Sequence, residues 1–522
     1  MLPFSHIAAA LSTFLVVSFV GTLPTAAKQR LPTEGISPAM PRTGLQSNGG
    51  LEISVFNLRA FHPGDRIDGQ VLLKAGYKAP SAVQLEFSGR LKTKFVAQIG
   101  NSRTICRGRA PLLRQQATFG QFYADAGGGI SWPFTVTIPY TVTPLPRDPS
   151  RRLDADDDVD WPQSHGFLSS SDDVEREPLP SVFCYYNAAD ADTEGYVEYA
   201  LACTAADPDD GKNIWRATFP LLLRTPSTEQ PIEDFGPHVL AYRFPVQSSQ
   251  LAAPAPTPER RSFGRRLSQV FKSPSQKYTF RLYLQSPGVI QLGHPRPLEF
   301  KIWTMPIIHP EFTNIDPAQA PPVAVTAVSV SLKSIYRIRA PAGGLLNGSV
   351  PVSNCSHVFT LLPTTTLAVP LLLAPLLSGP PPPSGPAVSG PHANAPPGFR
   401  NAIGLAPPAA AADLGAVLDV AVHRPGPGSL AISPSMRTWS IAVEHTLLVT
   451  MEIACADKTF RVPHEAAVRV LAAPEVQMRA VEDGLGAEGM RKNYDDLALG
   501  AQVGMRAAAG ALAILGLLSV VS

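Results

Sequence analysis

The stretch between residues 61 and 71 constrains the fold of this chain more than any other. It places Pro63, Gly64 and Asp65 between two segments in which apolar residues alternate with polar ones. Alternation with a period of two puts the apolar side chains on one face of a β-strand. Proline presets φ, glycine permits the backbone of a tight turn, and aspartate accepts hydrogen bonds from nearby amides. The stretch therefore predicts strand, turn and strand, with Gly69 at the start of the second strand.

Further segments of short-strand character follow, with turn-forming residues between them. No amphipathic helical pattern of the kind a βαβ unit needs separates them, so the order of segments favours a β-sandwich. The segments, with the residues that mark them, are 83–89 (Gly89), 130–138 (Trp132 and Phe134, before Pro139), 179–183 (Pro180) and 196–201 (Tyr199).

Taken together, these segments resemble the arrestin-like N-terminal domain of the alpha-arrestin family, in its fungal type. The matching patterns are PGD-x-I-x-G-x-V, V-x-L-x-F-x-G, W-P-F-x-V-x-I-P, L-P-S-x-F and G-x-V-x-Y-x-L, and they cover roughly residues 51 to 225. The resemblance implies an all-β chain of two tandem immunoglobulin-like, arrestin-type β-sandwiches. It also implies that the marker residues of each segment have structural roles.

The pattern continues into a second alternating region that begins at Tyr278 and resembles the arrestin C-terminal sandwich more loosely. An acidic run and a Pro/Ala/Gly-rich run interrupt the two regions. Neither can bury enough apolar surface to fold, so both are predicted to be disordered; an acidic docking segment for a basic partner is the alternative for the first. The predicted regions are 1–49 (apolar leader-like stretch and polar lead-in), 50–225 (first sandwich, with the acidic loop 144–178), 226–277 (basic linker), 278–473 (second sandwich, with the insertion 363–434) and 474–522 (tail, with the apolar end 507–522).

Composition narrows the class of protein. The chain has 54 prolines in 522 residues, which favours irregular connections over helical bundles because proline ends helices. Its net charge is +2, which gives no electrostatic reason to expect nucleic acid as a partner. The five cysteines include no Cys-x-x-Cys pair, which favours buried thiols in a reducing compartment. Cys184 and Cys203 are candidates for a disulfide if the chain is exported.

Both ends of the chain carry apolar segments that leave two localisations open. Residues 8–22 resemble the apolar core of a signal peptide, with a cleavage site near Ala27, but no basic residue precedes them. Residues 507–522 are uncharged and shorter than the ~20 residues of a spanning helix. We therefore expect a cytoplasmic protein that is peripheral at membranes, and a chain starting at Met40 that folds without the leader. Entry into the secretory pathway, with the C-terminal segment as anchor, is the alternative.

The linker contains a basic amphipathic segment between residues 259 and 272. Wound as a helix, it gathers apolar side chains on one face, which is typical of a segment that lies on an anionic membrane. Serines beside the basic residues are candidate kinase sites, because phosphate would cancel the positive charge. A flexible linker with solvated arginines is the alternative. The candidate membrane contacts are Arg260, Arg261, Phe263, Arg265, Arg266, Leu267, Phe271 and Lys272, and the candidate phosphorylation sites are Ser262, Ser268 and Ser273.

Catalytic and metal-binding signatures occur only as near misses. His464 begins a His-Glu pair, but the second histidine of His-Glu-x-x-His is replaced by Val468. Residues 190–195 open like a calcium loop, but the twelfth position is Leu201 rather than the glutamate that the site needs. We therefore expect no enzymatic activity, no metal and no cofactor.

The resemblance implies an adaptor. Alpha-arrestins link membrane transporters or receptors to ubiquitin ligases and to the endocytic machinery. The implied partners are cytoplasmic segments of membrane proteins, and the implied roles are trafficking and ubiquitin-dependent down-regulation. The chain has no Pro-Pro-x-Tyr motif for the WW domains of a ligase, and only the proline run 380–383 stands in its place. The alternative is an exported, C-terminally anchored cell-surface protein, which glycosylation at Asn347 or Asn354 would support.

Overall fold

A computed structural model of the chain describes the following residues: 46–99, 101–124, 128–142, 167, 177–187, 193–209, 214–248, 251, 276–316, 319–340, 351–373, 400–401, 408–422, 432–480 and 483. In this part of the chain the fold is all-β, as the alternation predicts. Its strands form four sheets, in which all pairings but one are antiparallel, and the helical structure is limited to α3 (Leu414–Leu418) and a short helix at 475–480.

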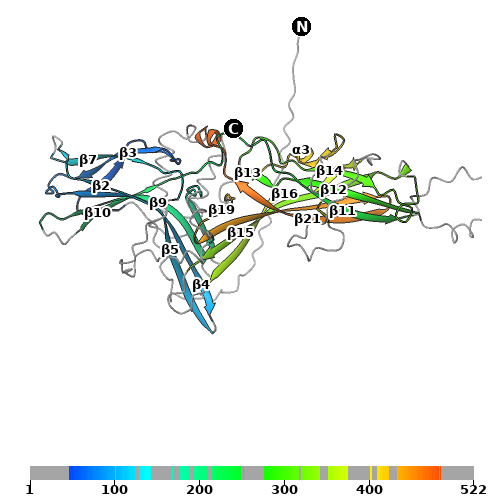
Figure 1. The fold of residues 1–522 in the computed structure, drawn as a ribbon, viewed down its shortest axis with the longest axis horizontal. Helices are drawn as coiled ribbons and strands as arrows, with labels where there is room; N and C mark the ends of the chain where they lie inside the picture. The colour runs from blue at the N-terminus through cyan, green and yellow to red at the C-terminus, as the bar shows by residue number, and fades with distance from the viewer. Residues whose placement is uncertain are drawn as a thin grey trace, which may run out of the picture. The chain divides into compact units, whose positions relative to one another are not determined.

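Two sheets, called the N-terminal sheets below, carry the first half (Figure 1). One has the order β1-β10-β9-β4-β5 with β8 beside β9, and the other has the order β2-β3-β7-β6. Leu51 and Trp132 of one sheet and Phe87 and Leu201 of the other belong to one buried apolar cluster, so the two sheets share a core. The strands are β1 (Gln46–Ser47), β2 (Leu51–Val55), β3 (Arg66–Leu73), β4 (Val83–Ile99), β5 (Ser102–Phe119), β6 (Tyr123–Ala124), β7 (Ile130–Thr137), β8 (Phe183–Asn187), β9 (Thr193–Ala206) and β10 (Ile214–Leu221).

Two further sheets, the C-terminal sheets, have the orders β17-β11-β12-β14-β18 and β13-β21-β20-β15-β16, with β19 beside β20. Phe280 and Ile302 of the first and Val325 and Leu447 of the second share another buried cluster. The strands are β11 (His238–Gln247), β12 (Lys277–Ser286), β13 (Val289–Gln291), β14 (Lys301–Pro306), β15 (Val323–Arg339), β16 (Val352–Leu373), β17 (Arg400–Asn401), β18 (Ala412–Asp413), β19 (Met436–Arg437), β20 (Ile441–Cys455) and β21 (Lys458–Leu471).

The Pro-Gly-Asp turn forms as predicted. Gly64 has φ of +88°, a region that side chains with a Cβ rarely adopt, and its amide donates to the carbonyl of Ile138 at 2.9 Å. The Asp65 carboxylate accepts from the amide of His62 at 2.8 Å, which closes the turn. β2 and β3 pair with Val55 opposite Gly69, so the two strands that flank the turn are neighbours in the sheet.

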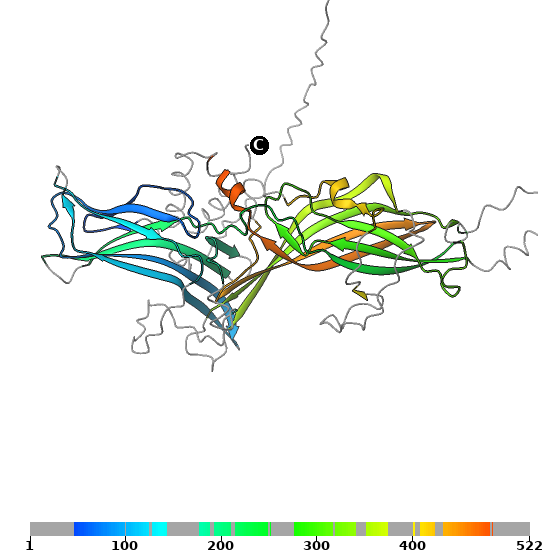
Figure 2. The ribbon, with the colours of Figure 1, turned by 45° about the horizontal axis from the view of Figure 1, so that its top comes forward.

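The N-terminal and C-terminal sheets meet through the ends of their long strands. Ile338 of β15 and Ile441 of β20 belong to the N-terminal core cluster rather than to the C-terminal one. The ring of Tyr185 on β8 stacks on that of Tyr336 on β15, with centroids 4.2 Å apart. Figure 2 shows the long strands of the C-terminal sheets extending toward the paired ribbon of β4 and β5. The first core is therefore closed by strands from the second half of the chain.

Two predicted boundaries are wrong, and one strand was not predicted. Residues 238–247 were assigned to the linker, but they form β11 and pair with β12 along its length. β16 runs to Leu373, into the insertion predicted to be disordered, and β18 and α3 form further along the same segment. Residues 363–373 contain three Thr and one Val, which favour strands, beside their two prolines. β5 was not predicted at all, because its arginines and Pro111 obscure its alternation.

Replacement of Gly64 tests the turn. We expect Gly64→Val to lower the free energy of unfolding by roughly 1–3 kcal/mol, because valine at this positive φ is strained. Gly120→Val is the matched control, since Gly120 has no positive φ and a Cβ at this position would have no atom within 4 Å. The control should change stability by less than about 0.5 kcal/mol. Urea unfolding of the full chain measures both. Equal midpoints would contradict the structural role of the turn.

Candidate functional site

The marker residues of the sequence motifs lie in the first core, where they contact one another. The hydroxyl of Tyr199 donates to the carbonyl of Pro180 at 2.7 Å, and burial raises the pKa of that hydroxyl well above its usual value. A Cβ at Gly89 would lie 2.5 Å from the Tyr199 ring, and one at Gly69 would meet the Phe134 ring at 2.7 Å. Glycine is thus required at both positions, because an aromatic ring covers the backbone at each and the carbonyl oxygen of Ser54 also approaches Gly69.

Two more markers complete this core. Trp132 is 1% exposed, and Pro139 follows the end of β7 in a half-buried position. The motif residues therefore position the sheets and do not form a ligand site.

The predicted membrane contacts and phosphorylation sites all lie between residues 260 and 273, outside the described residues. The acidic loop 144–178 is described only at Phe167 and residues 177–178, and the apolar segments 8–22 and 507–522 are not described. These hypotheses stay predictions.

A ladder of ion pairs lies on the strands that approach the junction of the two halves. β4 and β9 are paired so that Arg90 lies opposite Glu198 and Lys94 lies opposite Glu194. The Nζ of Lys94 is 3.0 Å from Oε1 of Glu194, and the Nζ of Lys92 is 2.5 Å from Oε1 of Glu198. Because alternate residues of a strand share a face, all these side chains lie on one face of the sheet. The opposite face of the same strands meets β15 and β20.

The ion pairs of this ladder are buried, so their role is to hold the strands together. Lys94 is 3% exposed and Glu194 is 0% exposed, so each charge depends on the other for compensation. Burial lowers the pKa of Lys92 to about 8, against the attraction of Glu198. On the far face, the hydroxyl of Thr93 donates to the carbonyl of Arg339 at 2.7 Å. The ion pairs therefore fix the part of β4 and β9 that joins the two halves.

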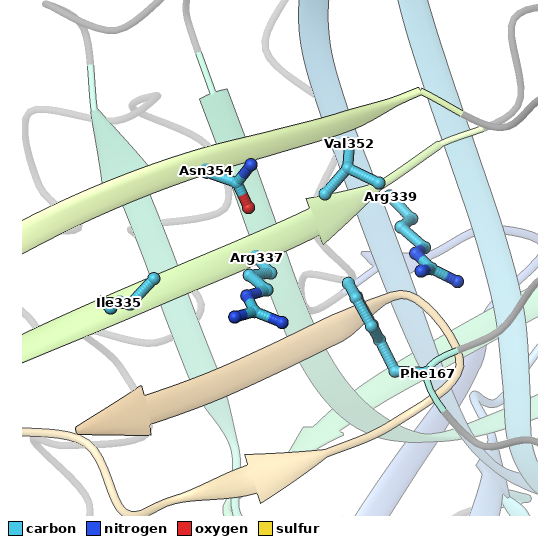
Figure 3. A pocket seen from close by; sticks show the side chains of 6 residues that line it. All are labelled: Phe167, Ile335, Arg337, Arg339, Val352 and Asn354. Atoms are coloured by element: carbon cyan, nitrogen blue, oxygen red, sulfur yellow. The ribbon is translucent and has the colours of Figure 1, made fainter. Parts of the chain in front are cut away.

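A pocket opens beside this junction, on the solvent-facing side of β15 and β16 (Figure 3). Its volume is about 370 Å³. Register places Arg337 opposite Asn354 and Arg339 opposite Val352, so the side chains of the two strands meet at its wall. The lining residues are Phe167, Ile335, Arg337, Arg339, Val352 and Asn354.

The pocket is cationic. Arg337 pairs with Glu444 at 3.0 Å, and Arg437 pairs with the same carboxylate at 3.3 Å. The guanidinium of Arg339 lies over the ring of Phe167, 4.0 Å from its centre, and burial together with the charge of Arg337 lowers its pKa. Among the residues that the structure describes, three arginines and one glutamate lie in and beside the pocket. Guanidinium groups hold carboxylates or phosphates through paired hydrogen bonds, so the pocket suits an anionic group.

Sequence reasoning missed this pocket. Arg337 and Arg339 are two residues apart in a segment that continues the alternation of residues 328–332, so a shared face for them was readable from the sequence. Their neighbours across the sheet were not readable, because β16 was assigned in part to a disordered insertion and Phe167 to a disordered loop.

A second contact surrounds the Pro-Gly-Asp turn. The Asp65 carboxylate lies 3.1 Å from Arg59 and 3.6 Å from Arg479, which follows the last strand. Glu475, in the same short helix, pairs with Arg479 at 2.6 Å and lies 4.0 Å from Nδ1 of His62. The turn that opens the first sheet is therefore also where the chain docks after its last strand, which the sequence did not predict.

His464, the near miss for a metalloprotease motif, bridges strands inside the second core. Its Nδ1 is 2.9 Å from the hydroxyl of Tyr242 and its Nε2 is 3.0 Å from that of Ser286. His445 is buried likewise, 2.8 Å from the hydroxyl of Ser334. Burial lowers the pKa of both histidines to about 4. Their surroundings make them neutral cross-strand links.

No group of three or more His, Cys, Asp or Glu side chains suited to a metal ion occurs in the described ranges. Within those ranges, no helix combines the length and the apolar character that crossing a membrane requires. All five cysteines are described, as thiols rather than disulfides, and four of them are buried, so the pairing of Cys184 with Cys203 is not present.

No protein-family model matches this chain, and no curated protein is significantly similar to it.

The buried ion pair can be tested against an exposed one. Lys94→Met should lower the free energy of unfolding by about 3–5 kcal/mol, because it leaves Glu194 charged and uncompensated in the core. Lys78→Met is the control: Lys78 makes an ion pair of similar length with Asp209, 2.8 Å, but both side chains are largely exposed, and little change is expected. Denaturant unfolding measures each variant. A loss no larger for Lys94→Met than for the control would show that burial does not matter here.

Acid should destabilise the protein through its buried histidines. Both have pKa values lowered to about 4 when folded, against about 6.5 when unfolded, so the unfolded chain binds more protons between these pH values. The contribution of the two histidines to the free energy of unfolding is then fully present above pH 6.5. It falls as the pH drops toward 4, by up to about 1.4 kcal/mol per pH unit for each histidine. Unfolding at a series of pH values should give a shallower slope for His464→Asn. The exposed His309→Asn should keep the wild-type slope, and a wild-type slope in both would be inconsistent with this account.

Proposed function

We propose that this chain is an arrestin-like adaptor: two tandem arrestin-type β-sandwiches that bind the cytoplasmic segments of membrane-protein cargo and catalyse no reaction. The motif order between residues 51 and 225 supports the first sandwich, and the C-terminal sheets with their shared core support the second. The function then follows from the resemblance, in which such a pair of domains presents binding surfaces rather than a catalytic centre.

One observation carries the proposal. The two halves share a buried core, through Tyr336, Ile338 and Ile441, and are not joined by a flexible linker alone. A Cβ at Gly195 would lie 3.0 Å from Cδ1 of Ile338, so the strands approach closely at this junction. Domains joined through a core hold their surfaces in fixed register, which is what an adaptor needs in order to bind one partner across both halves. The cationic pocket lies beside this junction.

The proposed role is in endocytosis, trafficking and ubiquitin-dependent down-regulation of transporters or receptors. Because the chain has no Pro-Pro-x-Tyr motif, a ubiquitin ligase enters the proposal as a member of the complex and not as a direct contact. The basic linker segment 259–272 would place the adaptor on an anionic membrane surface.

Proximity labelling in the native cell tests the adaptor role. A promiscuous biotin ligase fused to the full chain should label integral membrane proteins of the plasma membrane and endosomes on their cytoplasmic segments. Deletion of the gene should slow the internalisation of the labelled transporters or receptors. The same ligase expressed alone in the cytoplasm is the control. Labelling of lumenal proteins only, or unchanged internalisation of every labelled protein, would reject the adaptor.

The exported cell-surface protein is the second candidate, and one observation favours it. Asn354 of the Asn-Cys-Ser sequon is exposed on β16, where an attached oligosaccharide could be accommodated. Digestion of the native protein with an endoglycosidase distinguishes the candidates. The adaptor should keep its electrophoretic mobility, whereas a shift that Asn354→Gln reduces would support export.

A further inference from the structure

The chain passes from the first half to the second through residues 222–237, here called the crossing segment, which join β10 to β11. The beginning of this segment bonds to the first half. The amide of Phe61 donates to the carbonyl of Leu222 at 2.8 Å. The hydroxyl of Thr225 donates to the carbonyl of Leu179. The crossing segment therefore leaves the first half as a bonded chain.

The rest of the crossing segment bonds to the second half. The hydroxyl of Ser227 donates to the carbonyl of Ala472, just after β21, at 2.6 Å. The carbonyl of Phe235 accepts from the amide of Val289 on β13 at 2.9 Å. The bonds thus change from one half to the other at Pro226, and a rotation of the halves against each other would turn the chain at this residue.

Gln291, the last residue of β13, contacts the crossing segment at three points directly after Pro226. Its side chain is buried, with 1% of the residue exposed. Its Nε2 donates to the hydroxyls of Ser227 and Thr228, at 2.9 Å each. Its Oε1 accepts from the amide of Ile232 at 3.0 Å. Both hydrogens of the side-chain amide are therefore used on the crossing segment.

The two hydroxyls require a donor at this position. A hydroxyl has one hydrogen to donate. The hydrogen of Ser227 goes to the carbonyl of Ala472, and the hydrogen of Thr228 goes to that of Gln230, also at 2.6 Å. Each hydroxyl oxygen is left as an acceptor. An amide supplies two donors and an acceptor, whereas a carboxylate of the same shape supplies acceptors only.

We propose that Gln291 is the positioning residue that makes the crossing segment a rigid strap, and that this strap holds the two halves in one orientation about Pro226. A buried polar network in which each member has its partners restricts the conformation of the segments that it joins. The strap is separate from the apolar junction of the two halves, and it serves an adaptor and an exported protein alike.

Hydrogen–deuterium exchange of the full chain tests the strap. Gln291→Glu keeps the size of the side chain, but the two hydroxyls can bond to a carboxylate only by giving up their carbonyl partners. At about pH 8.5 we expect residues 227–236 to exchange about tenfold faster than in the wild type. Gln84→Glu, which adds the same charge at an exposed position of β4, is the control and should exchange at the wild-type rate.

The pH dependence separates hydrogen bonding from packing. Burial raises the pKa of a carboxyl group, and a protonated carboxyl group has a donor. Relative to the wild type at each pH, Gln291→Glu should recover part of its protection at about pH 6.5. Gln291→Leu fills the same space without polar atoms and should exchange rapidly at both pH values. Equal exchange of the two variants at both pH values would show a packing role only and overturn the proposal.

Single-molecule energy transfer tests whether the strap holds the halves. Dyes on encoded amino acids at Lys78 in the first half and Lys458 in the second, both exposed, report the distance between them. We expect Gln291→Leu to broaden the distance distribution and Gln84→Glu to leave it unchanged. Circular dichroism verifies that each variant keeps its β structure.

A second variant releases the strap without altering Gln291. Ser227→Ala/Thr228→Ala removes both acceptors and should broaden the distribution in the same direction, which keeps the test available if Gln291→Leu does not fold. A distribution as narrow as that of the wild type in every folded release variant would overturn the proposal, because the strap would then not be what holds the two halves.

Discussion

The packing of β15 and β20 against β4 and β9 is the constraint on which the rest of the structure depends. The long strands of the second half enter the core of the first, where Ile338 and Ile441 lie against Gly195. A side chain at Gly195 would have to displace the ends of these isoleucines by a few tenths of an ångström, so the close packing depends on the two strands of the first half being held in place. The ion pair of Lys94 with Glu194 on their other face provides that rigidity, because separation of a buried pair costs several kcal/mol.

The Pro-Gly-Asp turn contacts parts of the chain that are more distant in sequence than the two strands of a hairpin. β2 and β3 are neighbours, but the chain between them first crosses to Leu223, where Phe61 forms a bridge with the end of the first half. Asp65 then binds the amide of His62 within the turn and Arg479 after the last strand. A single carboxylate thereby joins the turn to a residue that follows the last strand, which explains how a short polar sequence can organise distant parts of the fold.

Sequence periodicity predicted the elements whose two faces differ in polarity. β3 and β7 alternate because one face meets a core and the other is more exposed, whereas β12 alternates in sequence although nearly all of its residues are buried. β5 and β11 were not predicted, because arginines and prolines on their outer faces obscure the alternation. β16 was not predicted either, because it has almost no charged residues to mark a solvent-facing side. The cationic pocket could be predicted only in part: the shared face of Arg337 and Arg339 follows from their spacing, but the residues that complete it come from β16 and from Phe167. Contacts between strands far apart in sequence are not encoded in local alternation.

Energetics decides whether the basic side chains of β4 can recognise an anion. On β4 the lysines already compensate carboxylates in a buried setting, and removal of Lys94 from Glu194 would cost about 3–5 kcal/mol. A hydrogen bond from a charged donor to a partner's anion returns only about 1.5–3 kcal/mol, so opening the buried ladder for a ligand is unfavourable. Arg337 and Arg339 are partly exposed, and Arg337 shares the Glu444 carboxylate with Arg437. The ladder therefore holds the junction of the two halves together and is not available to bind a ligand.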